Sequence, residues 1–325
     1  MSRRRWHFPW LTPGPEPAAT QFAPPVETGA ALPMGAAPVP LDLSLSPQQL
    51  FSAAALQHAW LAVKRAKGGA GVDGVTLTQF AANLDDELHT LRTDLIAGEY
   101  RPRPLRQVVV PKPDDGLRSL AIWALRDRVA QRVVYDLLLP VFDPHFLACS
   151  YGFRLGLGVD DAVHAVLAYR NQNLRWVVDA DIRNCFDMIE RRRLAKLIRR
   201  RVRNRLILRY VDGWLDARIL TSADGRPRRA GAAQGGVLSP LFANIYLHEL
   251  DRALRRRNMA LVRYADDFVI LCRRKAEAQT AQAQAAVALQ RIGLEIHPQK
   301  TAIRHFDQGF AWLGYFFIRN EYFRM

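Results

Sequence analysis

Apolar residues recur every three or four positions in several stretches of the chain, and this is the spacing of amphipathic helices. The first stretch begins at Ser46, where the following proline suits the first turn of a helix. The same spacing predicts further helices over residues 80–95, 125–139 and 160–169. A glycine-rich break over residues 68–75 predicts a turn between the first two helices.

Short runs of β-branched and aromatic residues predict strands between these helices. Residues 108–110 and 117–120 flank a segment rich in Pro, Asp and Gly, which is typical of a hairpin. Another strand is predicted over residues 176–181, and a second hairpin is predicted from the apolar runs 261–264 and 268–271. Because helices and strands are mixed along the chain without a regular alternation, we expect an α+β fold.

The first part of the chain has a different composition. Ten of the 19 prolines lie between Pro9 and Pro47, interleaved with Ala and Gly. Such a segment cannot bury enough apolar surface to order itself. We therefore expect residues 1–46 to form a flexible extension, with the folded part beginning near residue 48.

Composition limits the class of protein. The chain has 325 residues, of which 49% are hydrophobic, enough for a sizeable core and one to three domains. It has no apolar run near the roughly 20 residues that cross a bilayer and no apolar core of a signal peptide, so we expect a cytoplasmic protein without a membrane partner. Cys149, Cys185 and Cys272 are odd in number and widely spaced, which predicts reduced, buried thiols.

The charge balance suggests a polyanionic partner. Lys and Arg number 46 against 31 Asp and Glu, which leaves a formal charge of +15, and nucleic acid is a common partner of such a chain. Ten of these cations lie within residues 191–209, threaded with Leu, Ile and Val, and predict one amphipathic basic helix. Its charged face could simply be solvated, but we favour contact with the phosphates of a duplex.

Acidic residues stand at apparent strand ends, where they could carry chemistry. Asp181 ends the strand predicted over residues 176–181, and the pair Asp266-Asp267 lies between two apolar runs. A tight turn there would project short carboxylate side chains that can bind a metal ion. Asp also favours turns for structural reasons, so the pair alone means little.

An ordered set of motifs surrounds these carboxylates. They are Val110-Pro-Lys112, Arg126-Asp-Arg128, Ser150-Tyr-Gly-Phe-Arg154, Asp181-Ile-Arg-Asn-Cys-Phe186-Asp187, Gln234-Gly-Gly-Val-Leu-Ser239-Pro240, Gly293-Leu-Glu-Ile-His-Pro-Gln-Lys300-Thr301 and Trp312-Leu-Gly314-Tyr315. In these motifs the sequence closely resembles bacterial reverse transcriptases of the group II intron type, from about Gly71 to Tyr315. The resemblance implies a right-hand polymerase fold, with fingers over residues 48–175 and a palm with a small antiparallel sheet over residues 176–325.

The resemblance also implies the metal site. Asp181 and Asp266 match the family's primary metal ligands, and Asp267 matches its second hairpin acid, with a supporting or direct role. Two Mg²⁺ ions about 3.5–4 Å apart can stabilise the attacking and leaving oxygens of nucleotidyl transfer. Mg²⁺ prefers hard oxygen ligands, so carboxylates and nucleotide phosphates suffice, and Mn²⁺ is an alternative ion.

The family's nucleotide-binding positions correspond to four residues. Phe186 matches the side chain under the incoming sugar, where a ring should clash with a 2′-hydroxyl; ordinary core packing is the alternative. Lys112 and Arg118 match cations that close on the triphosphate, against the alternative of exposed surface charges. Gln234 belongs to a glycine loop that is expected to approach nucleotide and template, before a helix that Ser239 caps and that runs to Asp251.

Other matched positions concern the leaving group, primer and template. Lys300 corresponds to the position proposed to protonate the leaving pyrophosphate, and a solvated lysine is the alternative. The turn at Trp312, Gly314 and Tyr315 matches the element that grips the primer end, with an aromatic core hairpin as the competing interpretation. Arg154 and Gly235 match positions that bind primer or template.

The sequence departs from the family pattern in ways that affect the expected partners. Residues 119–123 and 155–158 replace segments that are proline-glycine rich or more polar in relatives, which puts template contacts there in doubt. The chain stops ten residues after Tyr315, so the thumb is expected to be missing. A partner subunit could then supply a thumb or an integrase function, as in stand-alone enzymes beside CRISPR adaptation genes, in spacer acquisition or another defence system.

The predicted activity is RNA-templated DNA synthesis, in which dNTPs are added to the 3′-OH of a DNA or RNA primer. Two alternatives remain on sequence grounds. One is a catalytically silent nucleic-acid-binding subunit, against which the intact Asp181, Asp266 and Asp267 argue. The other is an RNA polymerase or terminal transferase with the same palm, against which Phe186 argues.

Overall fold

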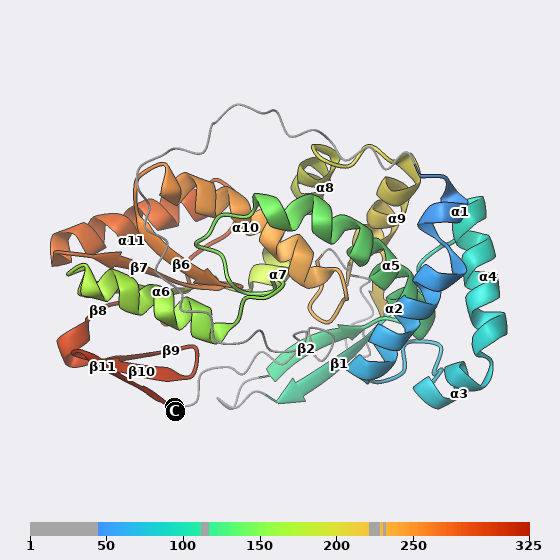
Figure 1. Cartoon of the computed structure of the whole chain (residues 1–325), viewed down its shortest axis with the longest axis horizontal. Helices are drawn as coiled ribbons and strands as arrows, with labels where there is room; N and C mark the ends of the chain where they lie inside the picture. Colours follow the sequence, from blue (N-terminus) through green and yellow to red (C-terminus); the bar gives the residue numbers. More distant parts are fainter. Residues whose placement is uncertain (1–44, 112–116, 221–227, 230–231) are drawn as a thin grey trace.

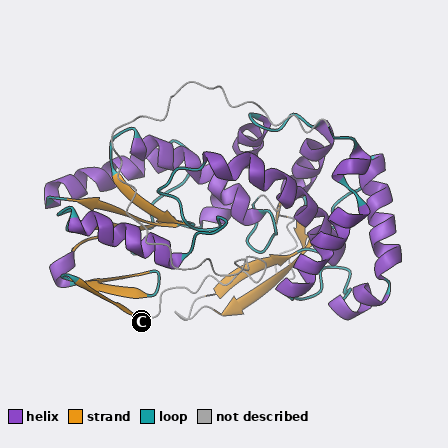
Figure 2. Ribbon diagram, in the orientation of Figure 1, coloured by secondary structure: helices purple, strands orange, loops and turns teal. Residues whose placement is uncertain are grey.

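The computed structural model describes residues 45–111, 117–220, 228–229 and 232–325. The extension expected over residues 1–46 therefore lies almost wholly outside the described residues. Helices dominate one end of the molecule and a sheet flanked by helices forms the other (Figure 1). Figure 2 shows the strands gathered in three separate places among these helices.

The first half of the chain forms a helical group that begins where the sequence predicted. Ser46, Ser52 and Thr76 each cap a helix, accepting a hydrogen bond from the backbone N–H three residues later. Buried Trp60 stacks on Phe80 and joins two of these helices. The helices are α1 (Pro47–Leu50), α2 (Ala53–Ala66), α3 (Leu77–Ala82), α4 (Leu84–Ala97) and α5 (Leu125–Phe142), followed by a 3₁₀ turn η1 (Asp143–His145).

The predicted first hairpin is present as β1 (Leu105–Pro111) and β2 (Leu117–Ile122). Its sheet continues through two strands from much later in the chain, β4 (Arg218–Leu220) and β5 (Arg228–Arg229), in the order β2-β1-β4-β5. The β1 and β4 strands pair in parallel, with Leu105 opposite Ile219. This sheet therefore takes strands from both sides of the boundary expected near residue 175.

The second half of the chain contains a four-stranded antiparallel sheet, the palm sheet, with the strand order β6-β7-β3-β8. Its strands are β3 (Trp176–Asp181), β6 (Ala260–Tyr264), β7 (Asp267–Cys272) and β8 (Ala302–His305). Alternate residues of β3 face opposite sides. Val178 and Ala180 belong to the large core that includes helices α10 (Ser239–Arg255) and α11 (Lys275–Gln290), whereas Val177 packs with α6 (Val159–Asn171).

The last strands form a separate small sheet in the order β11-β10-β9. They are β9 (Phe310–Trp312), β10 (Tyr315–Ile318) and β11 (Glu321–Arg324), preceded by the 3₁₀ turn η2 (Phe306–Gln308). Stacked Phe310 and Phe317 join this sheet to the core on the α6 side of the palm sheet.

The basic segment is two helices and not the single helix that its pattern predicted. After the short α7 (Cys185–Met188), α8 (Arg191–Arg199) ends and α9 (Arg205–Asp216) begins afresh. The Asn204 side chain accepts hydrogen bonds from the N–H groups of Leu206 and Ile207, so it caps α9. An Asn N-cap with extended backbone ends continuity between the two helices.

The helix after the glycine loop also differs from the prediction. Leu238 is the N-cap of α10, Ser239 is its first helical residue, and the helix continues to Arg255 and not only to Asp251. The Ser239 hydroxyl donates a 2.7 Å hydrogen bond back to the carbonyl oxygen of Ala233, so it closes the loop instead of capping the helix. Within the described part of the chain, the helices lack the combination of length and apolar character that crossing a membrane requires.

Candidate active site

The palm sheet brings the predicted carboxylates to one edge. In the pairing of β3 with β7, Asp181 lies directly opposite Asp267. Asp266 comes from the two-residue turn that joins β6 to β7, between the paired Tyr264 and Asp267. Asp181 and Asp266 are 6% and 4% exposed, so both of these acids are largely buried. Burial of several carboxylates together is unfavourable unless ligands or partners compensate for it.

The β6–β7 turn has a backbone that its sequence does not favour. Ala265 is at φ 58°, whereas Asp266 is not among the residues at positive φ, and this is the φ pattern of a type II′ hairpin turn. Glycine usually occupies that first turn position, because an L side chain is strained there. Such strain persists only where surrounding contacts hold it, and it concentrates at functional sites.

Arg263 supplies those contacts. Its side chain is fully buried and uses all five N–H donors. Nε and Nη2 donate to the two carboxylate oxygens of Asp251 at 2.7 and 2.6 Å. Nη1 donates to Ala265 O at 2.9 Å and to the amide oxygen of Asn244 at 3.0 Å, and Nη2 also donates to the Ser150 hydroxyl at 2.7 Å. Burial alone would lower the pKa of Arg263, but Asp251 raises it above its ordinary value.

The loop that contains Ser150-Tyr-Gly-Phe-Arg154 packs on the same turn. A Cβ added at Gly152 would lie 2.3 Å from the backbone nitrogen of Ala265. The Asn244 side chain donates a 2.8 Å hydrogen bond to Gly152 O, and Tyr151 N donates to Arg263 O at 2.9 Å. The loop, the turn and α10 therefore form one braced unit behind Asp266.

The pKa of the buried Cys185 thiol is affected by several nearby carboxylates. Burial raises the pKa of Cys185 well above its ordinary value, and the negative charges of Asp266, Asp181 and Asp187 raise it further. The three acids are therefore close enough to act on the same atom. Cys149, Cys185 and Cys272 form no disulfides, as predicted.

Lys300 lies beside the first carboxylate, Asp181. Its segment runs along the end of β3: His297 N donates to Asp181 O at 2.8 Å, and Ile296 bridges to Ile182. The ammonium nitrogen Nζ of Lys300 is 3.8 Å from Asp181 Oδ2. A partly exposed cation therefore stands next to a predicted metal ligand.

A second pairing of a carboxylate with a cation, between Asp179 and Arg304, lies at this face and was not predicted from the sequence. Asp179 lies two residues before Asp181, on the same face of β3, and is 3% exposed. Its carboxylate oxygen Oδ2 is 3.9 Å from Arg304 Nε on the adjacent strand β8. The alternation of side chains along a strand was the signal that could have identified Asp179.

Phe186 lies on α7, directly after the predicted metal ligand strand. It is 7% exposed and belongs to the large hydrophobic core. Core packing, the alternative to contact with the nucleotide sugar, therefore accounts for most of the surface of Phe186. The short helix starts after Asn184, which is at φ 44°, so the chain turns sharply between Asp181 and Phe186.

The glycine loop approaches protein and not open space. Gly235 is at φ 110°, and a Cβ there would lie 2.8 Å from Ala121 O on β2. Ala121 N donates a 3.1 Å hydrogen bond to Gln234 O, and Val237 N donates to Gln131 Oε1 at 3.2 Å. The close approach that the glycines permit is thus to β2 and α5, which ties the fingers hairpin to the palm.

The other nucleotide-binding candidates are less well defined. Arg118 lies opposite Val110 in the β1–β2 pairing, so it is on the hairpin arm that the sequence predicted, with its side chain outside the described part. Lys112 lies outside the described residues. Their proposed closure on a triphosphate stays a prediction.

Arg154 is committed to the protein itself. Its Nε donates to Asp143 Oδ1 at 3.0 Å, Nη2 donates to Asp143 O at 3.1 Å, and Nη1 donates to Leu147 O and Ser150 O at 3.2 and 3.0 Å. These contacts close the loop before α6. They favour a structural role over the predicted contact with primer or template.

The Trp312 to Tyr315 turn is a two-residue hairpin between β9 and β10. Leu313 and Gly314 are at φ 51° and 81°, the pattern of a type I′ turn, and nothing lies within 4 Å of a Cβ built on Gly314. Trp312 is buried in the aromatic cluster, whereas the Tyr315 hydroxyl donates to Asp160 at 2.6 Å. Trp312 is thus core. Gly314 has space around its Cα among the described residues, while its carbonyl oxygen accepts a 2.9 Å hydrogen bond from Met325 N.

The carboxylates fit Mg²⁺ in donor type, but they do not form a complete protein cage. Within the described ranges, no group of three or more His, Cys, Asp or Glu side chains is arranged to hold a metal ion by itself. Mg²⁺ in nucleotide enzymes is commonly held by one or two carboxylates together with substrate phosphates and waters. The donor type of these side chains is therefore compatible with Mg²⁺.

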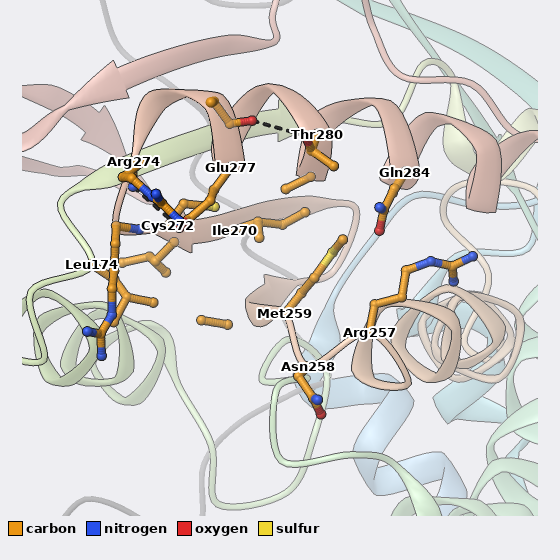
Figure 3. Close-up of a pocket in the computed structure, with 15 residues that line it drawn as sticks. Leu174, Arg257, Asn258, Met259, Ile270, Cys272, Arg274, Glu277, Thr280 and Gln284 are labelled. Atoms are coloured by element: carbon orange, nitrogen blue, oxygen red, sulfur yellow. Dashed lines mark hydrogen bonds and ion pairs between the residues drawn. The ribbon is translucent and has the colours of Figure 1, made fainter.

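A pocket of about 610 Å³ lies elsewhere, where β6 begins and β7 ends (Figure 3). Its lining includes Met259, Ile270 and Cys272, with Glu277 and Gln284 from α11. The β6–β7 turn is at the other end of these strands, so the pocket is not part of the carboxylate site. None of the predicted site residues lines it.

Comparison with known proteins is consistent with this geometry. The family model described as reverse transcriptase (RNA-dependent DNA polymerase) matches residues 110–317. Protein YkfC of Escherichia coli is 32% identical over 290 residues, covering 77% of this chain and 76% of YkfC. The group II intron-encoded protein LtrA of Lactococcus lactis is 29% identical over 202 residues, covering 62% of this chain but only 34% of LtrA.

Structural similarity supports the fold. Telomerase from Candida albicans, solved with a fragment of telomeric RNA, superposes with a TM-score of 0.51 at 12% identity, covering 74% of this chain and 48% of that chain. The mixed helices and small antiparallel sheets are those of a right-hand polymerase, as predicted. The family match covers more than half of this chain, and YkfC is similar to it over about three quarters of both chains. The chain therefore belongs to the reverse transcriptase family of RNA-dependent DNA polymerases and resembles its group II intron branch.

Proposed function

We propose that the chain synthesises DNA on an RNA template by adding dNTPs to a primer 3′-OH. The observation that carries this proposal is the pairing of Asp181 with Asp267, beside Asp266 in a turn that Arg263 braces. Asp181, Asp266 and Asp267 would hold two Mg²⁺ ions, or Mn²⁺ ions. Bound between these carboxylates and the nucleotide phosphates, such ions supply positive charge to the attacking and leaving oxygens.

The residues around the carboxylates take defined parts in this proposal. The primer 3′-hydroxyl loses its proton to solvent as its oxygen forms a bond to the α-phosphorus, and the bond from that phosphorus to pyrophosphate breaks. The Lys300 ammonium, next to Asp181, donates a proton to the departing pyrophosphate oxygen. The small exposed part of Phe186 meets the sugar and excludes a 2′-hydroxyl.

The partners follow the same proposal. The substrates are an RNA template, a DNA or RNA primer and dNTPs, and the turn at Gly314 approaches the primer end. Arg118 and Gln234 remain candidates for nucleotide contact, and Lys112 joins them on family resemblance. A protein subunit that supplies a thumb or an integrase function, and a role in CRISPR spacer acquisition, stay predictions.

Primer extension tests the proposal. Purified protein on poly(rA) with an oligo(dT) primer should incorporate dTTP only with Mg²⁺ or Mn²⁺, and Asp266→Asn should abolish incorporation. Asp307→Asn is the matched control, because Asp307 is an exposed acid in an ion pair with Arg175, and it should keep wild-type activity. Phe186→Ala should additionally accept rNTPs.

Two results would contradict the proposal. Equal inactivity of wild type and Asp266→Asn, with RNA binding retained, would favour a silent nucleic-acid-binding subunit. Incorporation that continues without any template would instead favour a terminal transferase.

A further inference from the structure

A cationic surface lies on the side of the palm opposite the carboxylates. Asp179 and Asp181 share the face of β3 with Val177, which packs with α6. Helix α10 packs on the other face, and α8 lies against α10: Glu190 N donates to the Tyr246 hydroxyl at 3.4 Å. In Figure 1, α8 and α9 accordingly lie at the top, whereas the β1–β2 hairpin and the C-terminal strands lie at the bottom.

Most exposed positions of this region are cations, and its apolar residues are used in packing. Leu194, Leu197 and Ile198 of α8 are buried. Arg192 and Lys196 are exposed one helical turn apart, and the connection to α9 adds exposed Arg203 and Arg205. We call Arg192, Lys196, Arg203 and Arg205 the cationic surface.

The acids nearby have other partners. The Glu190 carboxylate caps α8, accepting hydrogen bonds from the N–H groups of Arg192 and Arg193. Asp212 pairs with Arg199 and Asp216 pairs with Arg191, so these pairs tie α8 to α9. Glu249 of α10 lies 3.6 Å from both Arg200 and Arg252. In the part of the chain that the structure describes, none of the four residues of the cationic surface forms an ion pair.

Further cations crowd the edge of this surface. Burial and the nearby positive charge of Arg252 lower the pKa of Arg201, and Arg201 in turn adds to the burial effect that lowers the pKa of His145. Like charges held together on a rigid helix pair repel each other unless a polyanion neutralises them. The surface is therefore preorganised for repeated negative charges.

The surroundings distinguish between kinds of polyanionic partner. No large hydrophobic side chain of α8 or α9 is exposed. A protein interface usually has an apolar centre, and a membrane-surface helix inserts its apolar face, which in α8 is buried in the protein. Isolated guanidinium and ammonium groups instead suit the phosphates of a nucleic-acid backbone.

We propose that the cationic surface binds the RNA template outside the copying cleft, along the stretch that is not being copied. This inference rests on the proposed function, because a polymerase that copies RNA carries the remainder of a long template beside itself. It also changes the interpretation of the basic segment: these cations do not line the channel for the primer–template duplex.

The test compares two triple variants with the same loss of charge. Arg192→Gln, Lys196→Gln and Arg203→Gln together remove most of the cationic surface. The control combines Arg257→Gln, Arg273→Gln and Lys275→Gln, which remove three exposed cations at or beside the pocket of Figure 3. All six positions are exposed, so both proteins should fold like wild type.

Two measurements separate this surface from the cleft. Binding of a labelled RNA hairpin, followed by fluorescence anisotropy against salt, should weaken about 10-fold or more in the first variant. The slope of log K against log salt should fall by about 2 to 3, since each lost phosphate contact contributes about 0.9. Extension of a minimal poly(rA)–oligo(dT) substrate should stay at the wild-type rate in both variants.

Several outcomes would overturn the inference. They are unchanged hairpin binding, an equal loss in the control variant, an equal loss of extension on the minimal substrate, or equally tight binding of a DNA hairpin through the same cations. If wild type fails to extend any primer, the proposed function fails, whereas a selective loss of RNA binding would still locate an RNA site on α8.

Discussion

Arg263 donates a 2.9 Å hydrogen bond from Nη1 to the carbonyl oxygen of Ala265, the residue directly before Asp266. The same guanidinium holds both carboxylate oxygens of Asp251 on α10. A predicted metal ligand is thereby positioned by a buried cation that never reaches the substrate. The turn and the helix behind it should respond together to changes at this residue.

Arg263→Lys tests this brace. Lysine keeps the charge but has three donors on one atom and no planar fork, so it cannot serve Asp251, Ala265 and Asn244 together. We expect a folded protein with a lower Tm and a reduced kcat at little change in primer KM, measured by circular dichroism and primer extension. Removing one partner of a buried ion pair costs about 3–5 kcal/mol, so Arg263→Met should be far less stable. A Lys variant with wild-type kcat would show that the brace does not position the turn.

Gly152→Ala tests the contact between the loop and the turn. A Cβ there would meet Ala265 N at 2.3 Å, and backbone cannot move aside cheaply. Gly158→Ala is the matched control in the same loop, because its nearest neighbour would be a side-chain oxygen at 3.7 Å. We expect Gly152→Ala to lose most primer extension and several degrees of Tm, with Gly158→Ala close to wild type. Equal behaviour of the two variants would exclude a steric role for Gly152.

Gly235→Ala tests the link between the fingers hairpin and the palm. The change combines strain at φ 110° with a 2.8 Å contact to Ala121 O. Gly293→Ala separates these effects, because Gly293 is at φ 74° with nothing within 4 Å of the added Cβ. Both substitutions introduce strain at positive φ, and only Gly235→Ala adds the close contact. Gly235→Ala should therefore unfold at a lower urea concentration than Gly293→Ala, and its KM for dNTPs should be raised. The contact would be unimportant if both variants unfolded at the same urea concentration.

Asp127 gives the fold a pH dependence of known sign. Burial raises the pKa of Asp127 to about 6, although hydrogen bonds from Tyr100 and from Arg103 N oppose the shift. The folded state therefore binds a proton more tightly than the unfolded state, whose value is near 3.8. Its contribution to stability is present below about pH 4 and is lost as pH rises through about 6.

Chemical unfolding at several pH values measures this effect. The free energy of unfolding of wild type relative to Asp127→Asn should fall by up to about 3 kcal/mol between pH 4 and pH 7, from a shift of about two pKa units. Asp94→Asn, at a partly exposed acid paired with Arg126, is a control for the general loss of one carboxylate. A relative stability that stays flat over this range would show that Asp127 ionises normally.

Much of this site follows from local sequence pattern. Apolar runs on both sides of Asp266 and Asp267 predicted the β6–β7 turn, and the strand that ends at Asp181 was also predicted. Local spacing does not reveal contacts between distant residues. Arg263 contacts Ser150, which is 113 positions away, and Gly235 lies against Ala121, so these partners became apparent only in the fold.

The prediction of a single helix over the basic segment was wrong for a local reason. Its hydrophobic spacing continues almost unbroken from Arg191 to Arg209, and the break depends on one capping side chain, Asn204. Asn is a residue type that favours N-cap positions, but the periodic pattern continues across Asn204. The position of Trp312 could not be predicted for a different reason. The motif Trp312-Leu-Gly-Tyr315 contains two aromatic residues, and its sequence does not indicate which ring is buried in the core.

The parallel pairing of β1 with β4 has a consequence for how this enzyme can be divided. Leu105 and Ile219 sit next to each other although more than a hundred residues separate them, and Trp214 reaches back to hydrogen-bond Tyr100. A fragment cut at residue 175 would leave β1 without its neighbour β4 and Tyr100 without its indole partner. Chimaeras between relatives should therefore exchange residues 205–236 together with the N-terminal half. If only one of these two segments were exchanged, the side chains at the contact between them would no longer match.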